Sequence, residues 1–136
     1  EHIERLKAIS SGPVETLNQR ALADFLSTGE YERHLERIIP VYRARRNALL
    51  NAMQTYFPPE LRWTKPTGGF FVWIWLPENI LAIDLFYRSV KKGISIAPAN
   101  IFYPGPCPQN AFRLAFSHYS EDVLIRAVME IGWLMG

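Results

Sequence analysis

Apolar residues recur at helical spacing through the first half of the chain. The spacing predicts a helix over residues 14–27, which Gly29 is expected to end. A second three-and-four rhythm predicts a long helix over residues 31–56. Pro40 lies inside this helix and is expected to kink or restart it, because proline removes one helical hydrogen bond. The apolar stripe of the long helix consists of Leu35, Ile39, Tyr42, Leu49, Met53 and Tyr56.

The second half carries shorter patterns. Residues 69–76 are aromatic and β-branched and are apolar on both faces, which predicts a buried strand covered on both sides. Residues 83–92 predict a short helix with Gly93 just past its end. Residues 94–97 and 111–117 predict two more short strands.

The last segment predicts a helix and completes the fold class. Ser120 is expected to be its N-cap, because Glu121 and Asp122 place negative charge in the first turn. This order of elements predicts an α+β fold, in which helices cover a small mixed or antiparallel sheet and a long N-terminal helix precedes it. The expected buried face of the final helix consists of Leu124, Ala127, Val128, Ile131 and Leu134.

Composition narrows the class of protein. The 136 residues are 49% apolar and 21% charged with a net charge of +2, which is typical of a globular domain and gives no global reason to expect nucleic-acid or membrane binding. The single Cys107 excludes a disulfide framework and fits a reducing, cytoplasmic compartment. No run approaches the roughly 18 apolar residues of a membrane-spanning helix. The charged start without an initiator Met leads us to expect part of a longer polypeptide.

Arg113 has the most informative surroundings. It is the only Asp, Glu, Lys or Arg between Gly93 and Ser120, and in its expected strand it shares a face with the small residues Ala111 and Ala115. An unpaired buried guanidinium is costly, so Arg113 needs either an acid from elsewhere or an anionic ligand. Its planar fork matches a carboxylate. A ligand-binding arginine and a structural or strand-edge arginine both remain open on the residues alone.

Two other segments have more ordinary interpretations. Gly68-Gly69 is interpreted as a tight turn before a strand, with a close approach to a ligand as the alternative. The cluster of Arg43, Arg45 and Arg46 is interpreted as a solvated, salt-bridged helix surface, not a nucleic-acid patch.

The histidines and the cysteine predict no reactive centre. His2, His34 and His118 are widely separated and lack partners at ligand spacing, so no metal site is expected. His118 follows a strand end near Arg113 and is interpreted as a loop histidine, with a place in the arginine's site as the alternative. Cys107 lies in a proline-rich loop without a neighbouring base and is interpreted as an incidental thiol.

Three segments in a fixed order resemble a known family. Lys65–Pro77, Gly93–Pro98 with Phe102, and Asn110–Ser117 resemble the C-terminal part of fold-type I, class I/II aminotransferases, which use pyridoxal 5′-phosphate. The resemblance covers essentially the whole chain. It implies that residues 1–57 are the end of the large domain followed by the long interdomain helix, and that residues 58–136 are the small domain. Residues 1–57 are then expected to need the large domain as cover for their apolar stripe.

The resemblance also implies roles for residues. Arg113 stands where the family binds the substrate α-carboxylate. The Schiff-base lysine, the aspartate that pairs with the pyridine nitrogen and the phosphate-binding residues lie upstream of Glu1 in the family. No catalytic or cofactor-binding residue is therefore expected in this chain, and pyridoxal 5′-phosphate is expected only in the full-length parent. The family's Pro-Gly is here Pro98-Ala99, which restricts that loop.

Within the family, Gly29–Leu35, Tyr42–Arg46 and Gly93–Pro98 look most like MocR-type regulators of the GntR class. Those proteins join a winged helix–turn–helix to an aminotransferase-like domain that senses pyridoxal phosphate or an amino compound. Free-standing aminotransferases acting on aminoadipate or kynurenine share much of the pattern, and an interaction module with a structural arginine is a third interpretation. The expected partners are an amino-acid or amine-type carboxylate ligand, the parent's large domain, a second copy in a homodimer, and DNA only through an absent N-terminal domain.

Overall fold

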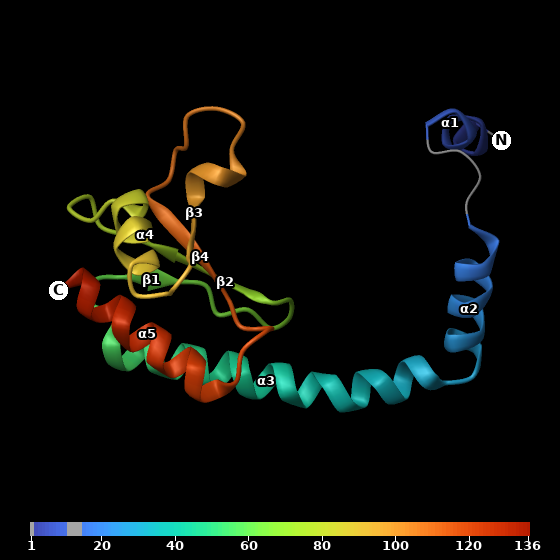
Figure 1. Cartoon of the computed structure of the whole chain (residues 1–136), viewed down its shortest axis with the longest axis horizontal. Coiled ribbons are helices and arrows are strands. Elements are labelled where there is room, and N and C mark those ends of the chain that lie inside the picture. Colours follow the sequence, from blue (N-terminus) through green and yellow to red (C-terminus); the bar gives the residue numbers. More distant parts are fainter. Residues whose placement is uncertain (1, 11–14) are drawn as a thin grey trace. The chain divides into compact units, whose positions relative to one another are not determined.

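The computed structural model describes residues 2–10 and 15–136 (Figure 1). It has the predicted α+β class, with one four-stranded antiparallel sheet and helices. Two compact units divide the chain, Glu1–Ile39 and Pro40–Gly136. The proposed domain division after residue 57 concerns the longer parent and stays a prediction. The elements are α1 His2–Ser10, α2 Thr16–Ser27, α3 Glu30–Tyr56, β1 Arg62–Trp63, β2 Phe71–Trp75, α4 Ala82–Val90, β3 Ala97–Pro98, the 3₁₀ helix η1 Ala99–Phe102, β4 Ala111–Ala115 and α5 Glu121–Met135.

The first unit holds α1, α2 and the start of α3. The helix expected over residues 14–27 is confirmed over Thr16–Ser27, whereas Val14 lies outside the described residues. Gly29, with φ +73°, separates α2 from α3. No described residue of α2 is buried. The exposed apolar side chains of α1 and α2 are Ile3, Leu6, Ile9, Leu17, Leu22, Phe25 and Leu26.

The long helix α3 is continuous from Glu30 to Tyr56, so the expected restart at Pro40 is wrong. Proline removes a single N–H donor, and Pro40 lies at an exposed position of a helix whose other residues keep helical geometry. The apolar stripe is covered at its C-terminal end, where Leu49 and Met53 are buried, whereas Ile39 is 46% exposed. The half of the stripe within the first unit therefore lacks full cover, as expected.

The sheet has the strand order β1-β2-β4-β3, and all its pairs are antiparallel. β2 and β4 pair over five residues, and β3 flanks β4 on the other side. The strands expected over residues 69–76 and 111–117 are present but shorter. The strand expected over residues 94–97 is misplaced, because β3 shares only Ala97 with it and continues into Pro98. β1 was not predicted from the sequence, because two residues are too few to show a period.

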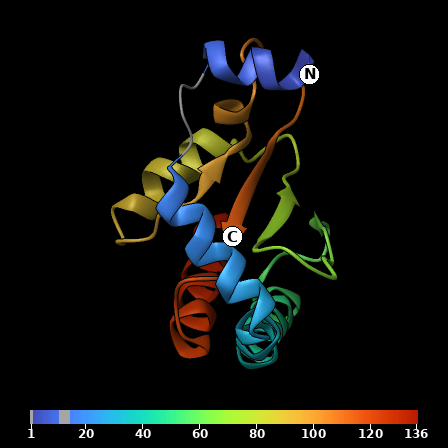
Figure 2. The same cartoon turned by 90° about the vertical axis from the view of Figure 1, so that its right-hand side faces the viewer.

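One face of the sheet forms the core with α3, α4 and α5. In both views α5 lies along the C-terminal half of α3 beneath the strands (Figures 1 and 2). Gly93 follows α4 with φ +75°, as its predicted place past the helix end requires. Ser120 occupies the N-cap position of α5, but its side chain makes no capping hydrogen bond. The fully buried large side chains are Leu49, Met53, Val72, Ile74, Leu85, Phe112, Phe116, Val128 and Ile131.

The other face of β2 is open within this unit. Val72 and Ile74 are buried, but Phe71 is 43% and Trp75 is 38% exposed. The prediction that β2 is covered on both sides is therefore wrong for this chain. An apolar run indicates that a face is to be buried, but it does not say whether the covering element belongs to the same chain.

Asn110, just before β4, joins the connection between β2 and α4. Its side-chain amide donates to the carbonyl oxygens of Pro77 and Ile80, both at 2.8 Å, and its Oδ1 accepts the N–H of Ala82 at 3.0 Å. The backbone carbonyl of Asn110 also accepts the N–H of Leu76 at 2.9 Å. The side chain thus fixes the start of α4 against the end of the central strand pair.

Replacing Asn110 with Ala is expected to lower the free energy of unfolding by about 1–2 kcal/mol, because three hydrogen bonds to part-buried backbone groups are lost. Denaturant unfolding measures the loss. Asn79→Ala, at an exposed position of the same connection, is the matched control and should change stability by less than about 0.5 kcal/mol. Equal effects of the two substitutions would contradict the bridging role of Asn110.

Candidate functional site

Arg113 lies at the centre of β4 on the open face of the sheet. In the strand register it stands opposite Trp73 of β2 on one side and Ala97 of β3 on the other. Its neighbours in β4, Phe112 and Leu114, point into the core and are buried, so the alternation predicted from the sequence is confirmed. Arg113 itself is half-buried.

Aromatic rings surround the guanidinium of Arg113. Its Cζ lies 3.9 Å from the centroid of the Phe71 ring and 4.4 Å from that of Phe102. The ring of Trp73 lies 5.7 Å from that of Phe102, centroid to centroid, and its Nε1 donates to Oε1 of Gln109 at 3.2 Å. Sequence analysis did not find this group, because its members lie on two strands, a 3₁₀ helix and a loop.

Arg113 has no acidic partner within residues 2–10 and 15–136. Ion pairs in this part of the chain involve other residues, among them Arg33 with Glu30 and Lys92 with Glu130. A structural salt bridge, which was the alternative interpretation of Arg113, is thus not seen among the described residues. The donors of the guanidinium remain available to an anion.

Gly68 and Gly69 form the expected turn before β2. Gly69 has φ +76°, a backbone conformation that favours glycine, and open space surrounds the position of a Cβ at either residue. The carbonyl oxygen of Phe70 accepts the N–H of Phe116, which joins the turn to the end of β4. The turn interpretation is sufficient for these glycines.

The interpretation of Arg43, Arg45 and Arg46 as a solvated, salt-bridged surface is wrong for two of them. Arg45 and Arg46 are half-buried and donate to backbone carbonyl oxygens, Arg45 to Ser117 and Arg46 to Pro66 at 3.2 Å. These bonds attach α3 to the loops that precede β2 and follow β4. The sequence could not show them, because the acceptors are backbone atoms of distant residues.

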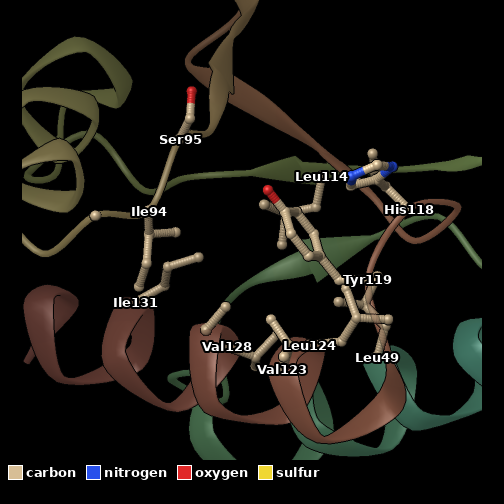
Figure 3. A pocket seen from close by; sticks show the side chains of 13 residues that line it. Leu49, Ile94, Ser95, Leu114, His118, Tyr119, Val123, Leu124, Val128 and Ile131 are labelled. Carbon is tan, nitrogen blue, oxygen red and sulfur yellow. The ribbon is translucent and has the colours of Figure 1, made fainter.

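His118 lies in the connection between β4 and α5. It is exposed, packs against Tyr119 and lines a pocket of about 320 Å³ between α5 and the β3–β4 side of the sheet. Figure 3 shows Leu114, Val128 and Ile131 in this pocket, with Tyr119 and His118 at one side. Leu114 and Arg113 are adjacent in a strand, so their side chains leave opposite faces of the sheet. His118 is therefore a loop histidine.

Cys107 and the remaining histidines form no reactive group in the described part of the chain. The Sγ of Cys107 lies 3.1 Å from the carbonyl oxygen of Gln109. No set of three or more histidine, cysteine or acidic side chains there is arranged to hold a metal ion.

None of the described helices has the length and apolar character to cross a membrane.

The lysines in the described ranges are exposed. Lys65, Lys91 and Lys92 are exposed, and Lys92 contacts Glu130 at 3.8 Å. Lys7 is also exposed. None of the four was singled out from the sequence as a cofactor lysine, and that interpretation stays a prediction. Ala99 replaces the family's glycine without strain, since no described non-glycine residue has a positive φ.

Comparisons with known sequences point to two kinds of protein. The chain is 32% identical over 117 residues to an uncharacterised aminotransferase of Saccharolobus solfataricus, over 86% of this chain and 29% of that protein. It is 31% identical over 133 residues to the uncharacterised HTH-type transcriptional regulator YdcR of Escherichia coli, over 98% of this chain and 28% of the regulator. The chain thus spans less than a third of these relatives. No protein-family model matches it.

Solved structures share the fold. Pyrococcus horikoshii kynurenine aminotransferase, in complex with PMP, matches 98% of this chain with a TM-score of 0.91 and 28% identity, over 33% of its own chain. Thermus thermophilus α-aminoadipate aminotransferase, complexed with N-(5′-phosphopyridoxyl)-L-leucine, matches 96% with a TM-score of 0.83 and 31% identity, also over 33%. The open sheet face with its central arginine belongs to an aminotransferase-like small domain. The chain is similar, in sequence and in fold, to the small-domain region of fold-type I aminotransferases, and the relatives that it matches include enzymes and HTH-type regulators.

Proposed function

We propose that this chain supplies the carboxylate-binding side of an amino-acid site in a longer, pyridoxal phosphate-dependent protein. The observation that carries the proposal is the half-buried Arg113 on an open sheet face, without an acidic partner among the described residues. A guanidinium binds a carboxylate through two parallel N–H···O bonds. The relatives solved with PMP or a phosphopyridoxyl–leucine compound support an amino-acid ligand next to the cofactor.

The open faces of the chain supply the second part of the proposal. The exposed apolar side chains of α1 and α2, and the exposed aromatic face of β2, would be covered by the large domain of the parent. That domain would also hold the cofactor, whose chemistry is to activate the bonds at the amino-acid α-carbon. Arg113 would hold the α-carboxylate of the ligand, and the parent would act as a homodimer in the cytoplasm.

The parent is proposed to be a MocR-type regulator of the GntR class, in which the site senses an effector. The 31% identity to the regulator YdcR over 98% of the chain supports this. A free-standing aminotransferase of aminoadipate or kynurenine type is the second candidate, supported by the 32% identity to the Saccharolobus solfataricus aminotransferase. An interaction module with a structural arginine has no such support, given the missing ion pair.

Two assays on the full-length protein separate regulator from enzyme. A regulator should bind DNA from its own promoter region with an affinity that changes when an amino acid is added. A free-standing aminotransferase should move the amino group of L-2-aminoadipate or L-kynurenine to 2-oxoglutarate and should not bind that DNA. Amino-group transfer without DNA binding would reject the regulator.

Residues 1–136 alone are expected to give no saturable, lysine-dependent absorbance with pyridoxal 5′-phosphate, because the family resemblance implies that the cofactor lysine lies outside this chain and the lysines of the described ranges are exposed. Spectrophotometric titration measures this, with the full-length protein as the positive control. A stoichiometric signal that disappears on replacing one of Lys7, Lys65, Lys91 or Lys92 would contradict the proposal that the large domain holds the cofactor.

A further inference from the structure

We infer that Phe71 and Phe102 are positioning residues for carboxylate recognition. They contact the guanidinium of Arg113 from the two sides of its strand, and they leave its N–H donors available for the ligand. This inference rests on the proposed role of Arg113. It adds two residues that set how strongly the site distinguishes a carboxylate from other groups.

The two rings approach Arg113 from opposite neighbours in the sheet. Phe71 belongs to β2, where it pairs with Ala115 and so stands diagonally across from Arg113. Phe102 belongs to η1, which directly follows β3 on the other side of β4. The Cζ of Arg113 lies over both rings, at 3.9 and 4.4 Å from their centroids. Rotation of the guanidinium away from this position would break two contacts at once.

These contacts stabilise the half-buried charge of Arg113 without using its hydrogen-bond donors. The face of an aromatic ring attracts a cation through its quadrupole, but it accepts none of the strong hydrogen bonds that a carboxylate would accept. A structural acid would stabilise Arg113 by occupying its donors and would then compete with a ligand. The two rings stabilise the charge and leave the planar fork unoccupied, in agreement with the missing acidic partner in the described ranges.

The ring of Phe102 is itself held in place. Trp73 contacts it at 5.7 Å between centroids and is fixed in turn by the hydrogen bond from its Nε1 to Gln109. Phe71 and Phe102 are 43% and 41% exposed, so neither ring is a core residue. Both rings also displace water from the guanidinium, which strengthens its hydrogen bonds to a ligand.

The test uses the full-length protein loaded with pyridoxal 5′-phosphate and calorimetric titration. The probes are L-leucine, L-phenylalanine, L-2-aminoadipate and L-kynurenine, and the one that binds most tightly is compared with the amine that lacks its α-carboxylate. The measured quantity is the ratio of the two dissociation constants. This ratio isolates carboxylate recognition, because a general loss of folding or cofactor would weaken both ligands together.

Phe71→Leu and Phe102→Leu are each expected to lower the ratio about five- to tenfold, on the scale of one lost cation–π contact. Phe102→Tyr keeps the ring face and should retain the ratio within about twofold. Phe70→Leu is the matched control, since Phe70 is adjacent and 44% exposed but packs on Tyr42. It should leave the ratio unchanged.

The outcomes separate this inference from the proposed function. If Arg113→Ala removes the discrimination but both leucine variants keep it, the positioning role is overturned and the role of Arg113 stands. If Arg113→Ala also leaves the ratio unchanged, or no probe binds better than its amine, both are overturned. If a leucine variant fails to fold, two other measurements test the positioning role. They are the ratio of dissociation constants in Phe102→Tyr and the rate at which phenylglyoxal modifies Arg113. We expect phenylglyoxal to modify Arg113 faster in a folded leucine variant than in Phe70→Leu. Equal modification rates would overturn the inference. Loss of carboxylate discrimination in Phe102→Tyr would also overturn it.

Discussion

Arg113→Ala in the full-length protein is expected to weaken amino-acid binding by about 2–4 kcal/mol, the scale of losing a charged, hydrogen-bonded pair. Arg113→Lys should restore little of this, because an ammonium cannot reproduce the planar two-bond fork. Pyridoxal phosphate binding should survive both changes, since the proposed cofactor contacts lie in the large domain. Calorimetry with an amino acid, and separately with the cofactor, measures the two effects.

The thermal stability of Arg113→Ala and Arg113→Lys tests the alternative that Arg113 has a structural role. Since no described acid pairs with Arg113, its removal strands no partner charge, and the melting temperature should change little. A structural arginine predicts the reverse, namely marked destabilisation with unchanged amino-acid affinity per folded molecule. That pattern would reject the ligand role.

Gly132→Ala is expected to destabilise the small domain by about 2–3 kcal/mol, because α5 lies against the end of α3 at this residue. A Cβ there would overlap the carbonyl oxygen of Tyr56 and would lie 3.1 Å from its carbonyl carbon. Backbone atoms of a packed helix cannot move aside as a flexible side chain can. The gain of about 1 kcal/mol that alanine normally brings to a helix interior is smaller than this cost. Denaturant unfolding measures the net loss.

Gly136→Ala and Gly105→Ala are the controls for this substitution, since open space surrounds the Cβ position at both residues. Their stability should stay within about 0.5 kcal/mol of the parent sequence. If Gly132→Ala proved as mild as these two, the close approach of α3 and α5 would be wrong.

Local patterns predicted the elements well, because each depends on residues that are near in sequence. Gly29 follows α2 and Gly93 follows α4, each with a positive φ, and the alternation in β4 correctly placed Phe112 and Leu114 in the core. Arg113 also emerged from a local observation, namely a single charge in an otherwise uncharged segment. The ligand role that the family resemblance attaches to it stays a prediction.

Long-range contacts could not be predicted in this way. Arg45 donates to the carbonyl of Ser117, 72 residues further along, and Asn110 bonds to backbone groups around residue 80. The partners in these bonds are main-chain atoms, which every residue type offers, so no sequence pattern marks them. The same holds for the ring of Phe102, whose place over Arg113 depends on how η1 leaves β3.

The two edges of the sheet limit how this chain can aggregate. An edge strand offers a row of free N–H and C=O groups to which another chain can pair, unless the strand is short or interrupted. Here β1 and β3 are two residues long, and β3 contains Pro98, which has no N–H to donate. Fibril-like growth by strand addition is thus disfavoured at both edges, although aromatic side chains remain exposed on the broad face. If copies of the isolated chain associate, they should do so through that face, as stacked pairs and not as extended ribbons.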